Sequence, residues 1–456
     1  MSRKQNKIYV FLCLEQDNTK NMLDVNHIKT VLRSNQVMVE NVKVVHRDFD
    51  FYDGANFVLV GVRRAGKSFL LFQQMQHLLN IGKTWKNMLY VNFEDDRLLG
   101  FETSDFERLL EAHASMSGSD EHPIMFLDEI QNIEGWHKFA RRLADHKYQV
   151  YITGSNAKML SSDIPTTLGG RYVVKTIFPY SYHEFLNVHG IHFSDDQTYL
   201  TTEKAKLNRC LEEYMTYGGF PEYATLPAKT EYLMSVYQKI YLGDIASRHK
   251  VENTFALRLM FKKLAESIKQ PLSFTRLTSL ISSTGTKFSK STAINYMEYS
   301  KDAFLVLPMQ NMADNFTERE TNMKYYFVDN GIISLLTLDN QTTLLENMVA
   351  TALWRKYEAF ENTVFFYNHN IEVDFVVPEH GLAIQACYDL GEDGSETYIR
   401  ETQALLKLSK KFSAYKRLII LTYSEREYQI NLDNKTIEVM NVGKWMLRSE
   451  SRIAKV

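Results

Sequence analysis

The sequence has few cysteines, few prolines and no long apolar run, and each shortage excludes a class of protein. Among its 456 residues are 3 Cys, and because Cys13, Cys210 and Cys387 lie far apart with no CxxC spacing, neither a disulfide framework nor a thiolate metal site is expected. With only 8 Pro and 20 Gly, the chain is neither collagen-like nor largely disordered. No stretch approaches the roughly 18 consecutive apolar residues of a membrane span.

The sequence also lacks an excess of charge of either sign. Lys and Arg together number 53 and Asp and Glu 55, which gives a net charge of −2, so nothing global indicates a nucleic-acid or membrane partner. Residues 1–30 are interpreted as a leader that stays in the mature protein, because the apolar run IYVFLCL ends at Glu15 and no small-residue cleavage site follows. With the cysteine usage, this predicts a cytoplasmic protein.

What the sequence does have is a change of pattern along its length, which predicts three domains of an α/β protein. Residues 31–180 alternate short apolar runs with amphipathic ones, as in a parallel sheet covered by helices. Residues 181–330 are mostly helical in pattern, and residues 331–456 mix helices with short β-type runs. The strands expected in the first domain are residues 56–60, 88–94, 123–129, 149–155 and 171–178.

The strongest motif is GVRRAGKS, which follows the apolar run NFVLV directly and precedes a helical pattern. It matches the phosphate-binding loop GxxxxGK[ST], whose backbone N–H groups surround phosphates at a helix N-terminus. Lys67 would reach the β and γ phosphates, and Ser68 would place its hydroxyl on Mg²⁺. The alternative interpretation is a chance glycine turn. The predicted nucleotide-binding residues are Gly61, Val62, Arg63, Arg64, Ala65, Gly66, Lys67 and Ser68.

The second half of such a site is a strand that ends in acids, and PIMFLDE supplies one. Asp128 at the strand end would hold the Mg²⁺, directly or through water, and Glu129 would polarise the water that attacks the γ-phosphoryl group. Taken alone, an apolar run followed by two acids is most often a strand end with a solvated turn. The GKS loop upstream favours the catalytic interpretation.

Two further residues are candidates for the same site. Asn156 follows the fourth expected strand and would orient the attacking water, although an Asn in this place is otherwise a turn former. Arg171 opens the fifth expected strand, where a guanidinium from the same subunit or a neighbouring one would stabilise the transferred phosphoryl group. The alternative for Arg171 is an ordinary surface arginine.

The near-neutral total conceals a basic segment in the middle of the chain. From Lys239 to Lys301, 8 Lys and 3 Arg stand against four acids, which gives +7 and leaves −9 for the remainder. Within it, SFTRLTSLISSTG and FSKSTAINYMEYSKDAF predict a helix-turn-helix with Ser289 as an N-cap, and FLVLPMQNM and KYYFVDN predict a wing hairpin. The second helix carries polar side chains suited to a DNA major groove. They are Lys290, Ser291, Thr292 and Asn295. A structural or protein-contact module is the open alternative.

Taken together, the ordered motifs resemble a known family. GVRRAGKS, FLDEIQNIEGW, TGSN, LGGR, PYSYHEFL and YGGFPE are similar to motifs of prokaryotic ATP-binding proteins of the AAA+ group that carry a C-terminal domain of unknown function. The resemblance covers most of residues 30–440. It implies ATP as the nucleotide, an AAA-type core, a winged-helix middle and a C-terminal fold like that of PD-(D/E)xK nucleases. It also implies that Asn156 is the sensor residue and that Arg171 matches an arginine of the GR motif.

The nuclease resemblance implies a metal site in the last domain, but the pattern is incomplete. Glu346, Asp374 and Gln385 have the expected order, in which carboxylates hold Mg²⁺ and a lysine assists the attacking water. The position expected for that lysine is Cys387, and an amide stands in place of the second acid. For Glu346 and Asp374 the alternatives are a solvated helix face and a strand-edge acid. We therefore predict a nuclease-like fold with weak or no cleavage.

Two functions are consistent with these observations. The first is a Mg²⁺-dependent ATPase that converts nucleotide state into a rearrangement of the winged-helix and nuclease-like modules. The second is an ATP-switched regulatory or interaction protein, DNA-associated or similar to toxin–antitoxin modules, with little turnover. The expected partners are ATP, DNA through the basic middle and a protein partner or second copy, with no membrane partner.

Overall fold

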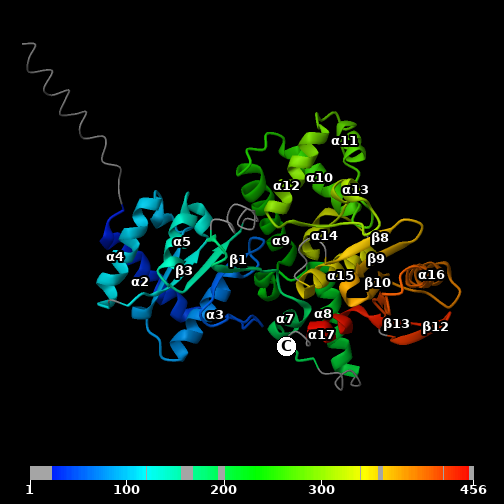
Figure 1. Ribbon diagram of the computed structural model, residues 1–456, viewed down its shortest axis with the longest axis horizontal. Coiled ribbons are helices and arrows are strands. Elements are labelled where there is room, and N and C mark those ends of the chain that lie inside the picture. The colour runs from blue at the N-terminus through cyan, green and yellow to red at the C-terminus, as the bar shows by residue number, and fades with distance from the viewer. Residues whose placement is uncertain are drawn as a thin grey trace, which may run out of the picture. The chain divides into compact units, whose positions relative to one another are not determined.

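The computed structural model describes most of the chain and separates it into two compact units (Figure 1). The described residues are 23–119, 121–155, 168–193, 201–338, 340–357, 363–424 and 426–450. The first unit runs to Val60 and then from Lys67 to Lys175, and the second comprises Gly61–Gly66 and the chain from Thr176 onward. In the described part of the chain, no helix combines the length and apolarity that crossing a bilayer requires.

The first unit is built on a five-stranded sheet in the order β2-β3-β4-β1-β5. All five strands lie within the ranges expected from the sequence, and the pairs β1–β4, β2–β3 and β3–β4 are parallel. The strands are β1 (Asn56–Val60), β2 (Met88–Asn92), β3 (Ile124–Asp128), β4 (Val150–Gly154) and β5 (Tyr172–Thr176). The predicted α/β class is confirmed, because runs such as NFVLV are buried throughout all but their first residue.

Helices cover this sheet. They are α2 (Val25–Asn41), α3 (Lys67–Asn80), α4 (Phe106–Ser117) and α5 (Trp136–Asp145), with short 3₁₀ turns η1 (Trp85–Asn87), η2 (Asp96–Leu98), η3 (Thr103–Asp105) and η4 (Ile130–Asn132). α2 packs on α4 and β2, whereas α3 and α5 pack on β4. Because β4 lies next to β1 and β3, the carboxyl ends of these three strands lie at one edge of the sheet.

The second unit begins with a helical region, as its sequence pattern predicts. Its helices are α7 (Tyr182–Val188), α8 (Thr201–Tyr217), η7 (Pro221–Thr225), α9 (Lys229–Gln238), the π-helix η8 (Lys239–Ser247), α10 (Thr254–Glu266), α11 (Phe274–Ser282), α12 (Lys290–Asp302), α13 (Phe316–Thr321) and α14 (Asn330–Leu336). A π-helix of nine residues is rare and commonly marks a functional position.

The expected helix-turn-helix and hairpin are present as secondary structure. α11 and α12 pack together, and Ser289 caps α12 by accepting a hydrogen bond from the backbone N–H of Thr292 at 3.1 Å. The strands β6 (Val306–Met309) and β7 (Lys324–Phe327) pair in antiparallel fashion. All four residues of β7 are buried, so this strand packs inside the unit and does not project as an exposed wing.

Two buried side chains, the carboxamide of Asn347 and the carboxylate of Asp329, fix β7 and the YGGFPE turn. Asn347 is fully buried and hydrogen-bonds the backbone N–H and C=O of Phe327 at 2.8 and 3.0 Å, as a neighbouring strand would. Asp329 accepts from the backbone N–H of Gly219 at 2.7 Å. A Cβ atom on Gly219 would lie 2.2 Å from the carbonyl oxygen of Tyr180, so this turn requires glycine.

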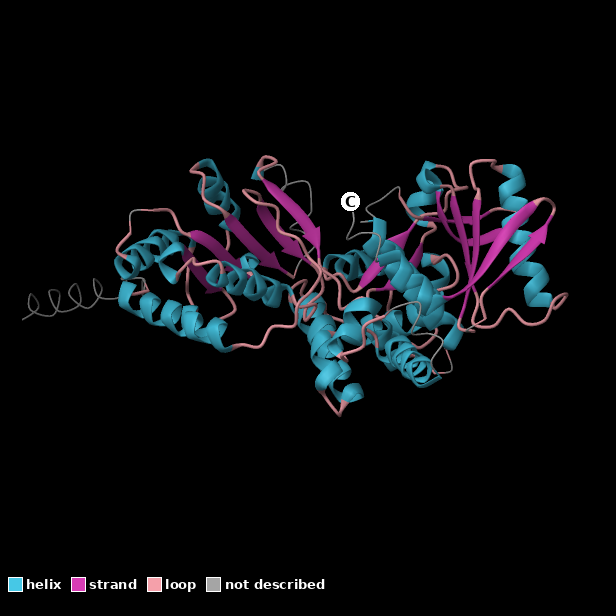
Figure 2. Ribbon diagram, turned by 90° about the horizontal axis from the view of Figure 1, so that it is seen from below, coloured by secondary structure: helices cyan, strands magenta, loops and turns pink. Residues whose placement is uncertain are grey.

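The chain ends in a six-stranded mixed sheet in the order β12-β13-β11-β10-β9-β8. Its elements are α15 (Gln341–Tyr357), β8 (Phe365–Asn368), β9 (Glu372–Val377), η9 (Pro378–His380), β10 (Leu382–Ala386), α16 (Glu396–Lys411), β11 (Arg417–Thr422), β12 (Tyr428–Leu432), β13 (Lys435–Asn441) and α17 (Val442–Glu450). Helices lie on both sides of this sheet (Figure 2). The sequence analysis missed β12 and β13, which meet at Asp433 and Asn434 in left-handed conformations.

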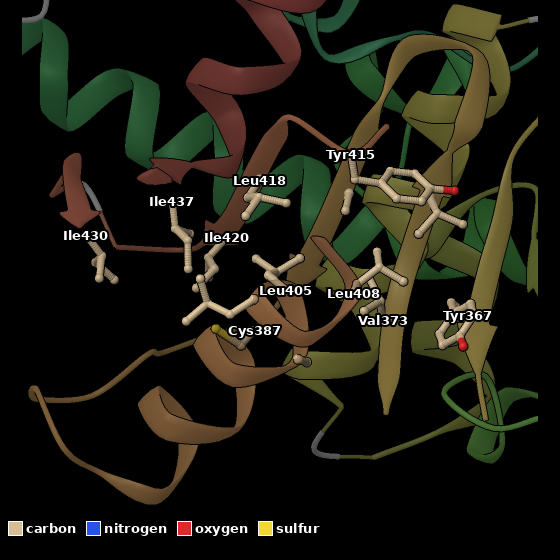
Figure 3. Packing of buried hydrophobic residues seen from close by; sticks show 14 of the residues in the cluster. Tyr367, Val373, Cys387, Leu405, Leu408, Tyr415, Leu418, Ile420, Ile430 and Ile437 are labelled. Atoms are coloured by element: carbon tan, nitrogen blue, oxygen red, sulfur yellow. The ribbon is translucent and has the colours of Figure 1, made fainter. Parts of the chain in front are cut away.

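α16 supplies much of the hydrophobic core of this sheet (Figure 3). Leu405 and Leu408 point from the helix toward Leu418 and Ile420 of β11, and none of the four is more than 1% exposed. Each such side chain contributes roughly 1.5–3 kcal/mol through burial. The core therefore holds β9 and β10, which carry the predicted nuclease-type residues, against a rigid helix.

Candidate active site

The phosphate loop joins the end of β1 to the start of α3, as the motif predicts. Gly61 (φ +146°), Arg64 (φ +66°) and Gly66 (φ +91°) all have positive φ angles, which turn the loop tightly before the helix begins at Lys67. A Cβ atom on Gly61 would lie 2.1 Å from the carbonyl oxygen of Ile177. The first glycine of the motif is therefore required by both its φ angle and its surroundings.

The first unit brings the predicted Mg²⁺ ligands together. The hydroxyl of Ser68, on the first turn of α3, donates to Oδ1 of Asp128 at 3.1 Å. Asp128 is the last residue of β3 and is fully buried. The hydroxyl of Tyr90 donates to its Oδ2 at 3.0 Å, and the hydroxyl of Thr153 donates to Oδ1. Asp128 is thus held by donors from α3, β2 and β4.

These surroundings change the acidity of Asp128. Burial and the nearby charge of Glu129 raise the pKa of its carboxyl to about 6, against the hydrogen bonds from Thr153, Ser68 and Tyr90. A cation beside this carboxylate would favour its ionised form.

Glu129 lies next to the lysine of the loop. Its Oε1 is 3.7 Å from Nζ of Lys67, which is buried, and its Oε2 accepts from the amide of Gln131 at 2.5 Å. The backbone of Glu129 is left-handed (φ +52°), and its N–H donates to the hydroxyl of Thr153 at 2.9 Å. The side chains of Glu129 and Asp128 have different partners: Glu129 contacts Lys67 and Gln131, whereas Asp128 binds Ser68, Tyr90 and Thr153.

The residues present fit a bound nucleotide with Mg²⁺. Mg²⁺ prefers oxygen ligands such as hydroxyls and carboxylates. Ser68 supplies a hydroxyl and Asp128 a carboxylate, and the two oxygens lie 3.1 Å apart. Lys67, at the N-terminus of a 14-residue helix, adds the fixed positive charge that phosphates require. The structure thus brings together the four residues that the two motifs predicted, which are Lys67, Ser68, Asp128 and Glu129.

The side chains of the loop arginines pair with acids. Within the second unit, the guanidinium of Arg63 binds the carboxylate of Asp244 on η8 through Nε at 2.9 Å and Nη2 at 3.1 Å. Arg64 donates to Glu222 at 2.5 Å. Phosphate binding by Arg63 and Arg64 stays a prediction, for which the backbone N–H groups of the loop are suited.

The other two predicted catalytic residues have different outcomes. Asn156 lies outside the described residues. Arg171 is paired with Asp145 at 2.6 Å, and its carbonyl accepts from Asn56 at 3.3 Å. Asn56 begins β1, whereas the phosphate loop follows the end of β1, about 16 Å along a five-residue strand. Arg171 thus lies beside the start of β1, away from the end of the strand that leads into the phosphate loop. Its catalytic role, from the same subunit or a neighbouring one, stays a prediction.

Three residues of the site were missed by the sequence analysis. Tyr90 and Thr153 bind the carboxylate of Asp128 from the neighbouring strands β2 and β4, and Gln131 binds Glu129. Their positions in the sequence could have indicated Tyr90 and Thr153, because side chains near the carboxyl ends of neighbouring parallel strands lie at the same edge of the sheet.

The predicted nuclease-type residues are near one another but differ from expectation. Glu346 is 2% exposed, so a solvated helix face is wrong for it. The amide of Gln385 bonds to backbone groups, because its Oε1 accepts from the N–H of Asp374 and its Nε2 donates to the carbonyl of Glu372. Burial raises the pKa of the Cys387 thiol to about 12, which keeps it neutral. A lysine that the sequence analysis missed, Lys324, lies among the acids instead.

With Lys324 among these acids, the described residues include no group of three or more His, Cys, Asp or Glu side chains arranged to hold a metal ion.

Two family matches cover separate parts of the chain. Residues 54–186, which include the phosphate loop and both acids of the site, match the AAA domain family. Residues 208–343 match a family described as a domain of unknown function, DUF8612. This matched range covers most of the helical region and ends before β8.

A relative matches nearly the whole length. An uncharacterized protein of Methanocaldococcus jannaschii is 32% identical over 430 residues, which are 91% of this chain and 94% of that protein. The chain belongs to the same family. An uncharacterized protein of Haemophilus influenzae is 31% identical over 417 residues, or 88% of this chain and 96% of its own. Both relatives match most of the chain, including parts of both units.

Solved structures are less similar. A Walker-type ATPase of Pyrococcus abyssi shares 14% identity with a TM-score of 0.36, covering 70% of this chain and 97% of its own. Cdc6p of Pyrobaculum aerophilum shares 13% identity with a TM-score of 0.25, covering 73% and 97%. TM-scores this low do not establish a common arrangement of the whole chain.

Proposed function

We propose that this protein binds ATP with Mg²⁺ and hydrolyses it at the site formed by Lys67, Ser68, Asp128 and Glu129. The observation that carries the proposal is the hydrogen bond between Ser68 and Asp128 at 3.1 Å. These residues are 60 positions apart in the chain, and nothing in a strand-to-helix turn requires them to meet. A site shared by loop and strand end is what metal-bound nucleotide chemistry requires.

Each residue has one task in this mechanism. Lys67 pairs with the β and γ phosphates, and Ser68 and Asp128 hold the Mg²⁺. The metal ion, when bound, neutralises charge that develops on the phosphate oxygens. Glu129 orients and polarises the attacking water, and Gln131, which already binds its carboxylate, keeps that carboxylate in place. Tyr90 and Thr153 position Asp128.

Nucleotide binding is tested by removing the ammonium group of the loop. Lys67→Ala is expected to weaken binding of a fluorescent ATP analogue at least ~100-fold, because a buried, charge-assisted phosphate contact is lost. The matched control is Lys83→Ala, which removes the same charge from an exposed position beyond the end of α3. Equal affinity of both variants and the wild type would contradict the proposed site.

We propose further that ATP turnover is coupled to the helical and C-terminal parts of the second unit. The supporting contact is that of Asp244 with Arg63, which links a residue of the phosphate loop to the π-helix η8. An ATP-switched interaction protein with little turnover is the alternative, and the rate of phosphate release separates the two.

A DNA contact through α12 is a second candidate function. Lys290, Ser291 and Asn295 are exposed on this helix, and the segment from Lys239 to Lys301 carries the +7 charge counted in the sequence. An exposed helix of a helix-turn-helix with basic and amide side chains is suited to a major groove.

The DNA contact predicts a salt dependence. Affinity for duplex DNA is expected to fall steeply with salt, and Lys290→Ala is expected to lower the slope of log K against log [salt] by about 1, because one phosphate contact disappears. Lys407→Ala, an exposed lysine on α16, serves as the control in fluorescence anisotropy. No binding at low salt would leave α11 and α12 with a structural or protein-contact role.

A further inference from the structure

Lys324 is a buried lysine at the centre of the carboxylates of the C-terminal domain. Its side chain is 0% exposed, and its Nζ lies 3.5 Å from Glu346, 3.3 Å from Glu372 and 3.9 Å from Asp374. These acids come from α15 and β9, whereas Lys324 opens β7. The ring of Phe366 lies 5.3 Å from the same ammonium group. One ammonium group thus contacts three carboxylates and an aromatic ring.

Protein donors already engage two of these acids. Glu346 accepts from the hydroxyl of Tyr326 at 2.9 Å through Oε1, the atom nearest to Lys324. Oδ2 of Asp374 accepts from the backbone N–H of Ala386 at 2.9 Å. The ammonium group of Lys324 is accommodated beside both donors.

Lys324 offsets part of the charge of the cluster without a metal ion. Burial alone lowers the pKa of Lys324, but the attraction of Glu346, Asp374 and Glu372 outweighs it and raises the pKa overall, so the ammonium group stays charged. Burial and the charge of Glu346 raise the pKa of Asp374, so this acid takes up a proton more readily than a free one. The lysine, which lies within 4 Å of all three carboxylates, therefore lowers the negative charge that would attract a divalent cation.

We propose that the ammonium group of Lys324 is the resident cation of the C-terminal carboxylate cluster and occupies the place that a divalent metal ion would take, so that this domain holds no metal. The domain then keeps two of the acids expected from the nuclease resemblance, Glu346 and Asp374, with a lysine in the place of the metal ion. The inference is independent of the proposed ATPase site, which lies in the other unit.

The test measures Mn²⁺ binding to the full-length chain by electron paramagnetic resonance. Asp128→Asn is introduced in every sample to silence the ATPase site. This background is expected to bind no Mn²⁺ that depends on Glu346. Adding Lys324→Met, which keeps the unbranched stem of the side chain and removes the ammonium group, is expected to create one Mn²⁺ site per chain. Adding Glu346→Gln as well is expected to abolish that site.

A thermal measurement accompanies it, with Lys416→Met as the control because Lys416 is exposed. Lys324→Met is expected to lower Tm by roughly 5–10 °C, because it leaves buried carboxylates unpaired, and Mn²⁺ is expected to restore much of that loss. The control is expected to show neither effect.

Three results would overturn the proposal, and the first two do not require the Lys324 variant to fold. They are Mn²⁺ binding to the background protein that Glu346→Gln abolishes, Mn²⁺-dependent plasmid nicking that Asp374→Ala abolishes, and failure of a folded Lys324→Met variant to bind Mn²⁺.

Discussion

Replacing Glu129 by glutamine is expected to stop ATP turnover while leaving ATP bound. The amide has the shape of the carboxylate but cannot accept a proton from water, so the water-activating step loses its base. We expect kcat to fall at least ~100-fold, within the range for losing a general base. Affinity for ATP is expected to stay within about threefold, because Lys67, Ser68 and Asp128 are untouched and each threefold change is only about 0.65 kcal/mol.

The measurement pairs single-turnover phosphate release with equilibrium binding of the same nucleotide. Glu134→Gln is the matched control, since Glu134 is an exposed acid in the turn that follows the same strand. Wild-type turnover in the Glu129 variant would move the catalytic base elsewhere. A parallel loss of binding would instead mean that the carboxylate supports the structure of the phosphate loop through Lys67, 3.7 Å away.

The largest expected loss of stability comes from Asn347→Ala. This side chain is 0% exposed and makes three hydrogen bonds, two to the backbone of Phe327 and one to the side chain of Asn330 at 2.9 Å. Truncation leaves the N–H and C=O of a buried strand without these partners, at about 1–3 kcal/mol for each group. We expect the free energy of unfolding of the second unit to fall by about 3 kcal/mol.

Differential scanning calorimetry of the full chain checks this, because 3 kcal/mol corresponds to roughly 6–12 °C in a unit of this size. Gln341→Ala, which removes an exposed amide from the first turn of the same helix, is expected to change Tm by less than about 2 °C. If the two variants have the same Tm, water or a rearranged neighbour forms the hydrogen bonds to the Phe327 backbone in place of Asn347.

Much of the fold could be predicted because its signals are local. Strands such as β1 and β3 are short continuous apolar runs, which is the pattern of a sheet buried on both faces. The hairpin of β12 and β13 was not predicted because its strands are not continuous apolar runs but alternate exposed and buried residues, a different strand pattern. Its turn, Asp433–Asn434, also lacks the glycine of the commonest hairpin signal. The π-helix η8 had no signal, because its hydrogen-bond register is set by packing.

The two candidate sites differ in how far they could be predicted. Lys67, Ser68, Asp128 and Glu129 are fixed by spacing within two short motifs, so the sequence was sufficient. Lys324 could not be found in this way. The nuclease pattern places its lysine two positions after Gln385 on β10. The ammonium group that lies among the acids comes instead from β7, a buried strand outside the C-terminal sheet. Contacts between residues distant in the chain depend on tertiary packing and leave no periodic trace.

The left-handed backbone of Glu129 has a consequence for how this position evolves. At φ +52°, a residue with a Cβ atom is disfavoured by about 1–2 kcal/mol, and only glycine adopts the conformation freely. At this position, selection for stability alone would favour glycine. Relatives that carry glycine here lack the carboxylate that we propose activates water, and they are therefore expected to have lost ATP turnover.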